Sequence, residues 1–403
     1  MTDTRPIQVD IAIVGGGLVG ASLACALAPL TERHGWRVAI IEAMSLSTSG
    51  ERSYQPSFDE RSSAIALGSR LHFEHIGIWE AMAEHASPIR HIHISERGRL
   101  GSTHMHAQDV HAEALGYVIP NAWMGQALMA RLDTLPLQRF CPAQVISAEP
   151  LPEGYRLALD SGQMIDARLM VLADGGRSPI KSLLGISDQV HDYHEHALIA
   201  NVEISRPHQG IAYERFDSAG PMALLPLEGQ RMGLVWTRAP DELAALLAMS
   251  DREFLAALQD TFGERVGRFR KVGSRHHYPL SKRQACEQIR PHLAILGNAA
   301  HSLHPVAGQG FNLALRGVMD LCAALEDQAQ RGELLGSMAA LSDFEHRRSQ
   351  DRLQIAEGSH LLVSLFGIDN MPLSHLRSLG LATLDKVGPL RRALMRRAMG
   401  VVR

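Results

Sequence analysis

Three glycines at fixed spacing, Gly15, Gly17 and Gly20, follow an apolar run from Val9 to Val14. Between a strand and a helix, this G-x-G-x-x-G spacing binds the pyrophosphate of a dinucleotide. The first glycine permits a tight turn, the second lets the ligand approach the backbone, and the third lets the helix pack on the strand. A helix beginning near Leu18 would turn its positive end toward the phosphates.

A carboxylate stands where such a site needs one for the adenosine ribose. A second predicted strand, Arg37 to Ile41, ends in Glu42, which lies 42 − 20 = 22 residues beyond the last glycine. The usual spacing is about 20 residues. A glycine-rich turn of an ordinary α/β protein is the alternative, and this motif does not distinguish FAD from NAD.

Two further motifs each follow an apolar strand. The segment Ala173–Ser178 reads ADGGRS and comes after the strand from Leu169 to Leu172. The segment Gly297–Asn312 reads GNAAHSLHPVAGQGFN, follows a strand from Leu293 to Leu296, and precedes a helix predicted from about Gly310.

In this order, GxGxxG, ADGxxS and GNAAHxxxPxxGQGxN resemble the motifs of the single-component aromatic hydroxylases of the flavoprotein monooxygenase superfamily, over about residues 9 to 330. GNAA, LHP and GQGFN together are similar to the ubiquinone-pathway ring hydroxylases that act on 2-octaprenyl-6-methoxyphenol. Further similar stretches are FDERSSAIAL (58–67), ISERG (94–98), IANV (199–202), ERF (214–216) and GPMALLPL (220–227).

The resemblance implies an enzyme that binds FAD, takes electrons from NADH or NADPH, and uses O2 to hydroxylate a prenylated phenol. Two alternatives stay open: hydroxylation of another ring position in the same pathway, and a flavin-bearing scaffold of a biosynthetic complex. A halogenase is disfavoured because the WxWxIP signature is absent and the four tryptophans are isolated.

The resemblance also assigns roles to single residues outside the glycine motif. Arg61 would lie along the FAD pyrophosphate or ribityl chain, where a guanidinium neutralises phosphate charge. Asn121 and Gln126 match positions near the ribityl chain, although Asn121 could instead cap a helix. Asp174 would position the cofactor rather than act as a base.

The loop that ends at Asn312 would lie against the isoalloxazine ring. A helix beginning near Gly310 would point backbone N–H groups at flavin N1 and O2, where the reduced ring is negative. The resemblance implies a catalytic loop of Pro305, Gly308 and Gly310, without identifying a base, and cofactor contacts from Gln309, Phe311 and Asn312.

Three positions depart from the pattern of these families. Asn298 stands where most members have aspartate, and its amide oxygen can still accept a hydrogen bond from a ribityl hydroxyl. Lys181 stands where arginine is usual, which puts details of the nicotinamide contact in doubt. Gly317 follows Arg316 where aspartate is usual.

The predicted fold class is α/β, with a Rossmann-like FAD-binding domain, a β-sheet substrate domain and a helical C-terminus. Strand-like runs between residues 197 and 237 predict the second sheet. The FAD-binding domain is predicted to comprise residues 1–75, 101–185 and 285–350. The substrate domain would comprise 76–100 and 186–284, and residues 351–403 the C-terminal helical segment.

The composition of the chain disfavours some classes of binding partner. The chain has 403 residues and a formal net charge of −3, so no global basic field is present for nucleic acid. Four scattered cysteines without a CxxC pair favour a reduced, cytoplasmic protein. His91 and His93, and likewise His104 and His106, alternate and are each predicted to share a strand face. No metal is predicted, since no cysteine or carboxylate joins them at ligand spacing.

The C-terminal stretch PLRRALMRRAMGVVR predicts a helix with Leu390, Leu394 and Ala398 on one stripe. Four arginines surround this stripe, at positions 391, 392, 396 and 397. A solvated terminal helix is one interpretation. The other is peripheral contact with the inner face of a membrane, or with other ubiquinone-pathway proteins, because a polyprenyl phenol resides in the bilayer.

Overall fold

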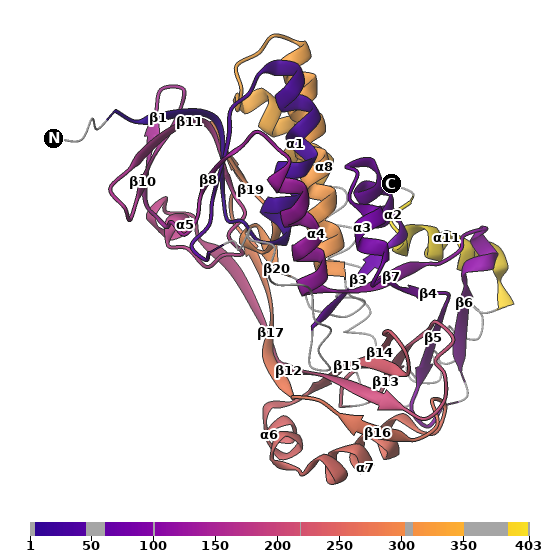
Figure 1. The fold of residues 1–403 in the computed structure, drawn as a ribbon. Helices are drawn as coiled ribbons and strands as arrows, with labels where there is room; N and C mark the ends of the chain where they lie inside the picture. The colour runs from indigo at the N-terminus through magenta and orange to yellow at the C-terminus, as the bar shows by residue number, and fades with distance from the viewer. Residues whose placement is uncertain are drawn as a thin grey trace.

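The computed structural model describes residues 5–45, 61–99, 101–217, 219–302, 309–349 and 386–401, and the loop residues Pro305 and Gly308 lie outside these ranges. Within them the chain forms two large sheets joined by long strands (Figure 1).

An eight-stranded sheet carries the sequence motifs. Its order is β18-β19-β11-β1-β2-β8, extended by an antiparallel hairpin of β9 and β10 on β11. The bounds are β1 Ile7–Val14, β2 Val38–Ile41, β8 Gln138–Phe140, β9 Val145–Leu151, β10 Gly154–Leu159, β11 Met164–Leu172, β18 Ile289–Arg290 and β19 Leu293–Ile295.

The ends of the central strands coincide. β2, β1, β11 and β19 are parallel, and Val14 pairs with both Ile41 and Leu172, while Leu172 pairs with Ile295. Because the carboxyl ends of these strands meet at one edge, the loops that follow them converge there.

Apolar side chains on the two faces of this sheet bury two separate clusters. On one face, α1 (Leu18–His34), α4 (Asn121–Asp133) and α8 (Gln309–Gln330) stand side by side and cover Ile11 and Ile13 (Figure 1). On the other face, the hairpin of β9 and β10 covers Ala12 and Val14. Alternating side chains of one strand thus serve both cores, which explains why β1 is apolar almost throughout.

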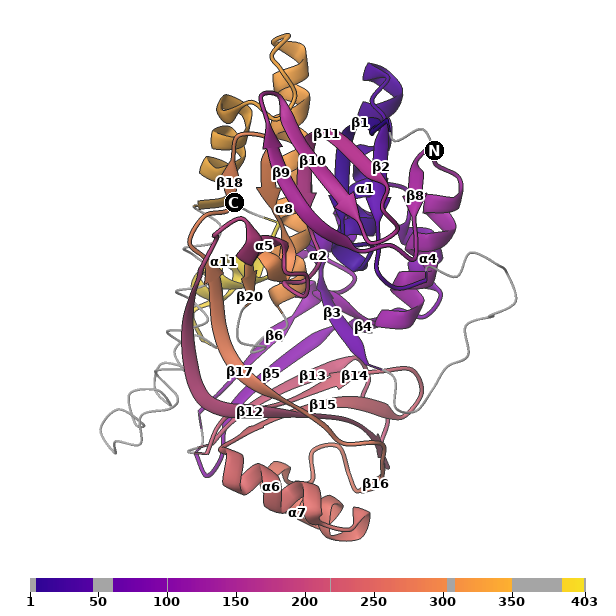
Figure 2. The ribbon, with the colours of Figure 1, turned by 90° about the vertical axis from the view of Figure 1, so that its left-hand side faces the viewer.

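The second sheet has nine strands in the order β20-β17-β12-β15-β14-β13-β5-β6, with β16 pairing on β12. α6 (Pro240–Ala248) and α7 (Asp251–Phe262) cover the face turned away from the first sheet (Figure 2). The bounds are β5 His91–Glu96, β6 Ser102–His106, β12 Asp188–Ile204, β13 Ile211–Phe216, β14 Met222–Pro226, β15 Arg231–Arg238, β16 Phe269–Val272, β17 His276–Ala285 and β20 His301–Ser302.

A small antiparallel sheet of β3 (Ser62–Ala66), β7 (Gly116–Pro120) and β4 (Ser87–Ile89) lies between the two large sheets. Val118 packs with Ala212 of the nine-stranded sheet, and Ala64 contacts this cluster. The remaining elements are α2 Leu67–His75, α3 Trp79–Ala83, η1 Ala107–Val110, α5 Ile180–Leu183, η2 Gly297–Ala299 and α11 Gly388–Ala398.

The predicted α/β class, with a Rossmann-like unit, a second β-sheet unit and a C-terminal helix, is confirmed. Strand pairing places β6 beside β5 in the nine-stranded sheet. The division of the chain into domains stays a prediction.

The predicted C-terminal helix is present as α11, and its sequence left the orientation open. Its buried side chains are Met395 and Met399, which pack with Met105 and Leu115, whereas Leu394 is 42% exposed. Glycine at position 68 permits the close docking, because a Cβ there would lie 2.4 Å from the Gly400 carbonyl oxygen. The Gly68 N–H donates to the Met399 carbonyl at 2.8 Å.

Candidate functional site

Each glycine of the first motif occupies a different environment. Gly15 has φ +107, and a Cβ there would lie 2.6 Å from the Ala173 carbonyl oxygen. A Cβ at Gly20 would lie 1.9 Å from the Gly15 carbonyl oxygen, so helix α1 approaches the turn too closely for any side chain. Gly17 is exposed, and a Cβ there meets no described atom within 4 Å. The space beside Gly17 is therefore open to a ligand.

The start of α1 suits a pyrophosphate. Gly17 is the N-cap and no side chain caps the helix, which leaves the first N–H groups free for an anion. Glu42 reaches the same turn, where its Oε2 accepts from the Gly16 N–H at 2.6 Å and its Oε1 from the Met44 N–H at 2.9 Å. Open backbone, a helix N-terminus and a nearby carboxylate fit the adenosine diphosphate part of FAD.

Asp174 organises the ADGGRS turn. Its Oδ1 accepts from the Gly176 N–H at 2.9 Å and its Oδ2 from the Ser178 N–H at 2.7 Å. The turn runs alongside η2, since a Cβ at Gly176 would lie 3.6 Å from the Asn298 backbone oxygen. The carboxylate therefore has a structural task in the protein itself, whatever it contributes to the cofactor.

Lys181 joins three segments at this edge. Its Nζ donates to both carboxylate oxygens of Asp188 at 2.6 and 2.8 Å and to the Ala299 carbonyl at 3.1 Å. It thereby ties α5 to the first residue of β12 and to η2. This departure from the family pattern has a local structural role that sequence reasoning did not identify.

Asn298 is exposed at the converging strand ends. We expect Asn298→Asp to change FAD affinity by less than about tenfold. A charged acceptor makes roughly twice as strong a hydrogen bond to a ribityl hydroxyl, but it also adds a negative charge near the pyrophosphate. The FAD affinity of the parent protein and of the variant is measured by titrating each apoprotein with FAD and following flavin fluorescence. A change of a hundredfold or more in either direction would show that one of the two effects dominates.

The start of α8 is fixed by Asn312, which is 1% exposed. Its Nδ2 donates to the Ala64 carbonyl at 2.9 Å, and its Oδ1 accepts from the Ala66 N–H at 2.8 Å. The side chain of Asn312 thus clamps α8 to β3, which leaves only its backbone for the predicted flavin contact. Phe311 stacks on Phe73 with ring centroids 6.1 Å apart.

Gly310 lies in the first turn of α8, where a Cβ would meet no described atom within 4 Å. Further along, a Cβ at Gly317 would lie 3.2 Å from the guanidinium carbon of Arg348, which is 2% exposed. Arg348 Nη1 donates to the Leu313 carbonyl at 3.0 Å. The absence of the usual aspartate therefore makes room for a buried arginine.

Arg61 and Asn121 meet near the start of β3. The Asn121 N–H donates to the Arg61 carbonyl at 2.9 Å, and the Asn121 side chain accepts from Ser63 Oγ at 2.7 Å. The N-cap of α4 is Pro120, so the alternative of Asn121 as a helix cap is wrong. Arg61 Nη1 donates to the Tyr278 hydroxyl at 3.0 Å.

Gln126 is exposed on α4. The flavin contacts of Arg61, Asn121 and Gln126 stay predictions. Two of these side chains are held by Ser63, which lies in the FDERSSAIAL stretch but was assigned no role from sequence, and by Tyr278, which carried no sequence signal.

The predicted histidine pairs lie on adjacent strands and pair with each other. His91 and His106 have their Nδ1 atoms 2.6 Å apart, and the rings of His93 and His104 stack at 4.5 Å. Burial, followed by the neighbouring His106 and other cations, lowers the pKa of His91. In the part of the chain that the structure describes, no three histidine, cysteine or carboxylate side chains are grouped to hold a metal ion.

Known proteins resemble the whole chain. A family model described as an FAD binding domain matches residues 8–353. The chain is 37% identical over 404 residues to the ubiquinone hydroxylase UbiL of Rhodospirillum rubrum, covering 100% of this chain and 92% of that protein. It is 31% identical to the 3-demethoxyubiquinol 3-hydroxylase of Escherichia coli, over 97% of this chain and 98% of that protein.

A solved structure has the same fold. The crystal structure of p-nitrophenol 4-monooxygenase PnpA from Pseudomonas putida superposes with a TM-score of 0.78 at 16% identity, covering 98% of this chain and 99% of that one.

Proposed function

Because this chain belongs to the FAD-dependent aromatic hydroxylases of ubiquinone biosynthesis, we propose that it hydroxylates a polyprenylated phenol of the 2-octaprenyl-6-methoxyphenol type, using NADH or NADPH and O2. The observation that carries the proposal is the meeting of four loops at one sheet edge. The glycine turn follows β1, the segment that begins at Glu42 follows β2, the ADGGRS turn follows β11, and η2 follows β19.

We expect this edge and the start of α8 to contact different parts of FAD. The uncapped start of α1 would bind the pyrophosphate, and Glu42 the adenosine ribose. The start of α8, held by Asn312, would direct N–H groups at the negative edge of the reduced ring. FAD itself, when bound, supplies the electron transfer from the nicotinamide and the activation of O2.

The test is hydroxylation of a short-chain prenylated phenol by the purified, FAD-loaded protein under ¹⁸O2. We expect the phenol to stimulate NAD(P)H oxidation and one ¹⁸O atom to enter the ring. FAD binding without stimulated oxidation would favour a scaffold instead. The Escherichia coli relative is named a 3-hydroxylase, so hydroxylation of a different ring position is the alternative. NMR of the product shows which ring carbon has been hydroxylated.

We also propose that α11 contacts an anionic membrane surface, where a polyprenylated substrate resides. Arg392, Arg396 and Arg397 are exposed on α11, while Arg391 pairs with Asp109 at 3.2 Å. No described helix is both long and apolar enough to cross a bilayer. Contact through this helix would therefore be peripheral.

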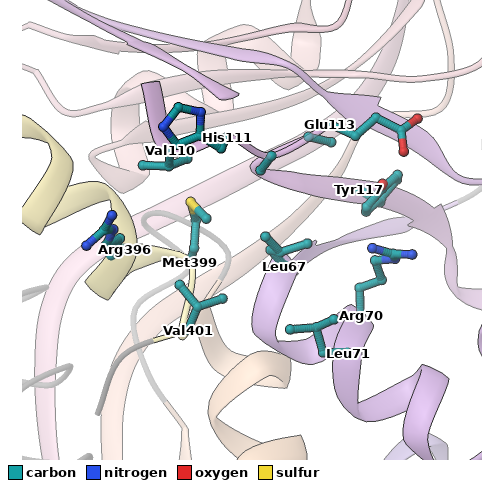
Figure 3. Close-up of a pocket in the computed structure, with 12 residues that line it drawn as sticks. Leu67, Arg70, Leu71, Val110, His111, Glu113, Tyr117, Arg396, Met399 and Val401 are labelled. Atoms are coloured by element: carbon teal, nitrogen blue, oxygen red, sulfur yellow. The ribbon is translucent and has the colours of Figure 1, made fainter. Parts of the chain in front are cut away.

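A cavity of about 340 Å³ opens beside these arginines, between α2, the segment 110–117 and the end of α11 (Figure 3). Leu71 and Val401 line it and are 45% and 38% exposed. Arg70 and Arg396 also line it. Apolar walls next to cations suit a surface that carries acyl chains beneath anionic headgroups.

Replacing Arg392, Arg396 and Arg397 by glutamine is expected to weaken association with anionic vesicles by roughly 10²-fold at low salt, since each cation near such a surface contributes about 1 kcal/mol. Co-sedimentation measures it. The control replaces Arg265, Arg268 and Arg270, three exposed arginines on the far side of the nine-stranded sheet, and should bind like the parent. Equal binding by both variants would contradict the proposal.

A further inference from the structure

Glu214 lies on the face of the nine-stranded sheet that is turned toward the eight-stranded sheet. Its neighbour Tyr213 points the other way, into the cluster under α6 and α7, with its ring 5.4 Å from that of Phe262. Because successive side chains of a strand point to opposite faces, Glu214 faces away from these helices. Ala212, two residues earlier, packs against Val118 of the small sheet between the two layers.

The same face looks toward the start of α8. Tyr278 pairs with Ala197 on this face, since Leu198 beside it belongs to the opposite cluster, and the Tyr278 hydroxyl accepts from Arg61. Arg61 directly precedes β3, and Asn312 of α8 clamps β3 through Ala64 and Ala66. A ring placed at the start of α8 would therefore have this sheet face opposite it.

Among the described residues, the strands beside Glu214 provide no positive charge to balance a carboxylate. Its cross-strand neighbours are Ala223 on β14 and Ile94 on β5. β14 and β3 carry no titratable residue, and on β5 the nearest one on this face is Glu96. Within the described ranges the Glu214 carboxyl makes no hydrogen bond or ion pair.

Glu214 nevertheless keeps some exposed surface. Burial by the surrounding protein raises its pKa to about 8. Glu214 is therefore a partly buried carboxyl on the sheet face that is turned toward β3 and the start of α8, and its charged form is disfavoured by desolvation.

We propose that Glu214 accepts the proton of the substrate's ring hydroxyl, an inference that rests on the proposed function. The phenol O–H bond breaks, its electron pair stays on the ring oxygen, and the proton moves to the carboxylate. The released electron density activates the ring carbons ortho and para to that oxygen, one of which takes the oxygen atom derived from O2. That carbon then gives up its hydrogen as a proton, which leaves with the second oxygen atom of O2 in water after reduction by NAD(P)H. The ring becomes aromatic again, and Glu214 returns its proton to the ring oxygen.

The pKa values of a phenol and of Glu214 favour this proton transfer. A phenol has a pKa of about 10 and an ordinary glutamate one of about 4.3. With its pKa raised to about 8, Glu214 is a stronger base, and the equilibrium for taking a phenol proton improves by more than about a thousandfold. The carboxylate form must be present first, so activity should follow its ionisation.

The FAD-loaded enzyme should show kcat/KM for hydroxylation rising about tenfold between pH 7 and pH 9, because the ionised fraction of a group with a pKa of about 8 rises from about 0.1 to about 0.9. We expect Glu214→Gln to lower hydroxylation by roughly 10²-fold at pH 8 and to abolish this rise. Its FAD content should remain that of the parent, and NAD(P)H oxidation should be diverted to hydrogen peroxide.

The matched control is Glu203→Gln, which removes the same charge from the same sheet beside Arg231 and Lys271, and it should keep the parental profile. A pH rise that persists in Glu214→Gln, or parental product yield in that variant, would overturn the role of Glu214. Absence of hydroxylation by the parent protein would instead refute the proposed function. The two failures are thus distinguishable.

Discussion

Gly20→Ala is expected to lower the melting temperature of the apoprotein by about 3 °C and to abolish FAD retention. The added Cβ would lie 1.9 Å from the Gly15 carbonyl oxygen, a backbone atom that cannot move without displacing β1 or α1. Overpacking of this kind costs about 1–3 kcal/mol, and the rigid backbone contact places it at the upper end. Thermal unfolding and the ratio of flavin to protein absorbance measure the two effects.

The same substitution three residues earlier separates packing from binding. Gly17 has φ −66, which alanine adopts without strain, and its Cβ would meet no described atom. Gly17→Ala should therefore keep the parental melting temperature without FAD and lose affinity for FAD, because the methyl group enters the space beside the pyrophosphate. If both variants unfold at the parental temperature, the close packing of α1 on the turn is not the reason for glycine at position 20.

Gly310→Val should reduce hydroxylation by about 10²-fold or more while leaving the stability of the apoprotein unchanged. Valine has a higher helix propensity than glycine, and an added Cβ meets no described atom within 4 Å, so we expect no loss of fold stability. It would, however, push the ring away from the N–H groups at the start of α8, and the loss of one such donor typically costs 10²–10³-fold in rate. Stopped-flow reduction by NAD(P)H and product yield measure the effect.

Gly310→Ala provides a graded comparison, since its single methyl group should have a smaller effect on the same two rates. Parental rates of reduction and hydroxylation in Gly310→Val would contradict the placement of this helix end at the flavin ring. A large loss of thermal stability would show instead that the position has a packing role.

The strands and the helix that surround the cofactor site could be predicted from short stretches of sequence. An apolar run, three glycines and a helix period are sufficient to predict β1 and α1, because both elements and the turn between them are short-range features. The later motifs place strands at β11 and β19 for the same reason. Parallel pairing then brings their ends together, which strand alternation alone does not specify.

Features that depend on distant partners were not predictable. In the sequence, Glu214 is one acidic residue in an alternating strand, and a solvated face is its ordinary interpretation. Glu214 is partly buried because the sheet of β3, β7 and β4 packs against the same face of β13. The C-terminal helix shows the same limit, since its period allows more than one apolar side, and contact with Met105 and Leu115 selects Met395 and Met399. Lys181 pairs with Asp188 across a turn that no motif describes.

The position of β19 in the sheet sets an order for biosynthesis. β1, with its glycine turn, leaves the ribosome first, yet its partner β11 follows some 150 residues later, and β11 is completed only by residues 293–295. The helix that begins at Gln309 comes later still. A nascent chain therefore exposes the β11 edge of its central sheet until residue 295 has been made. The FAD site is therefore assembled only after Asn312 has been synthesised, and a shortage of flavin would leave folded chains with an empty site.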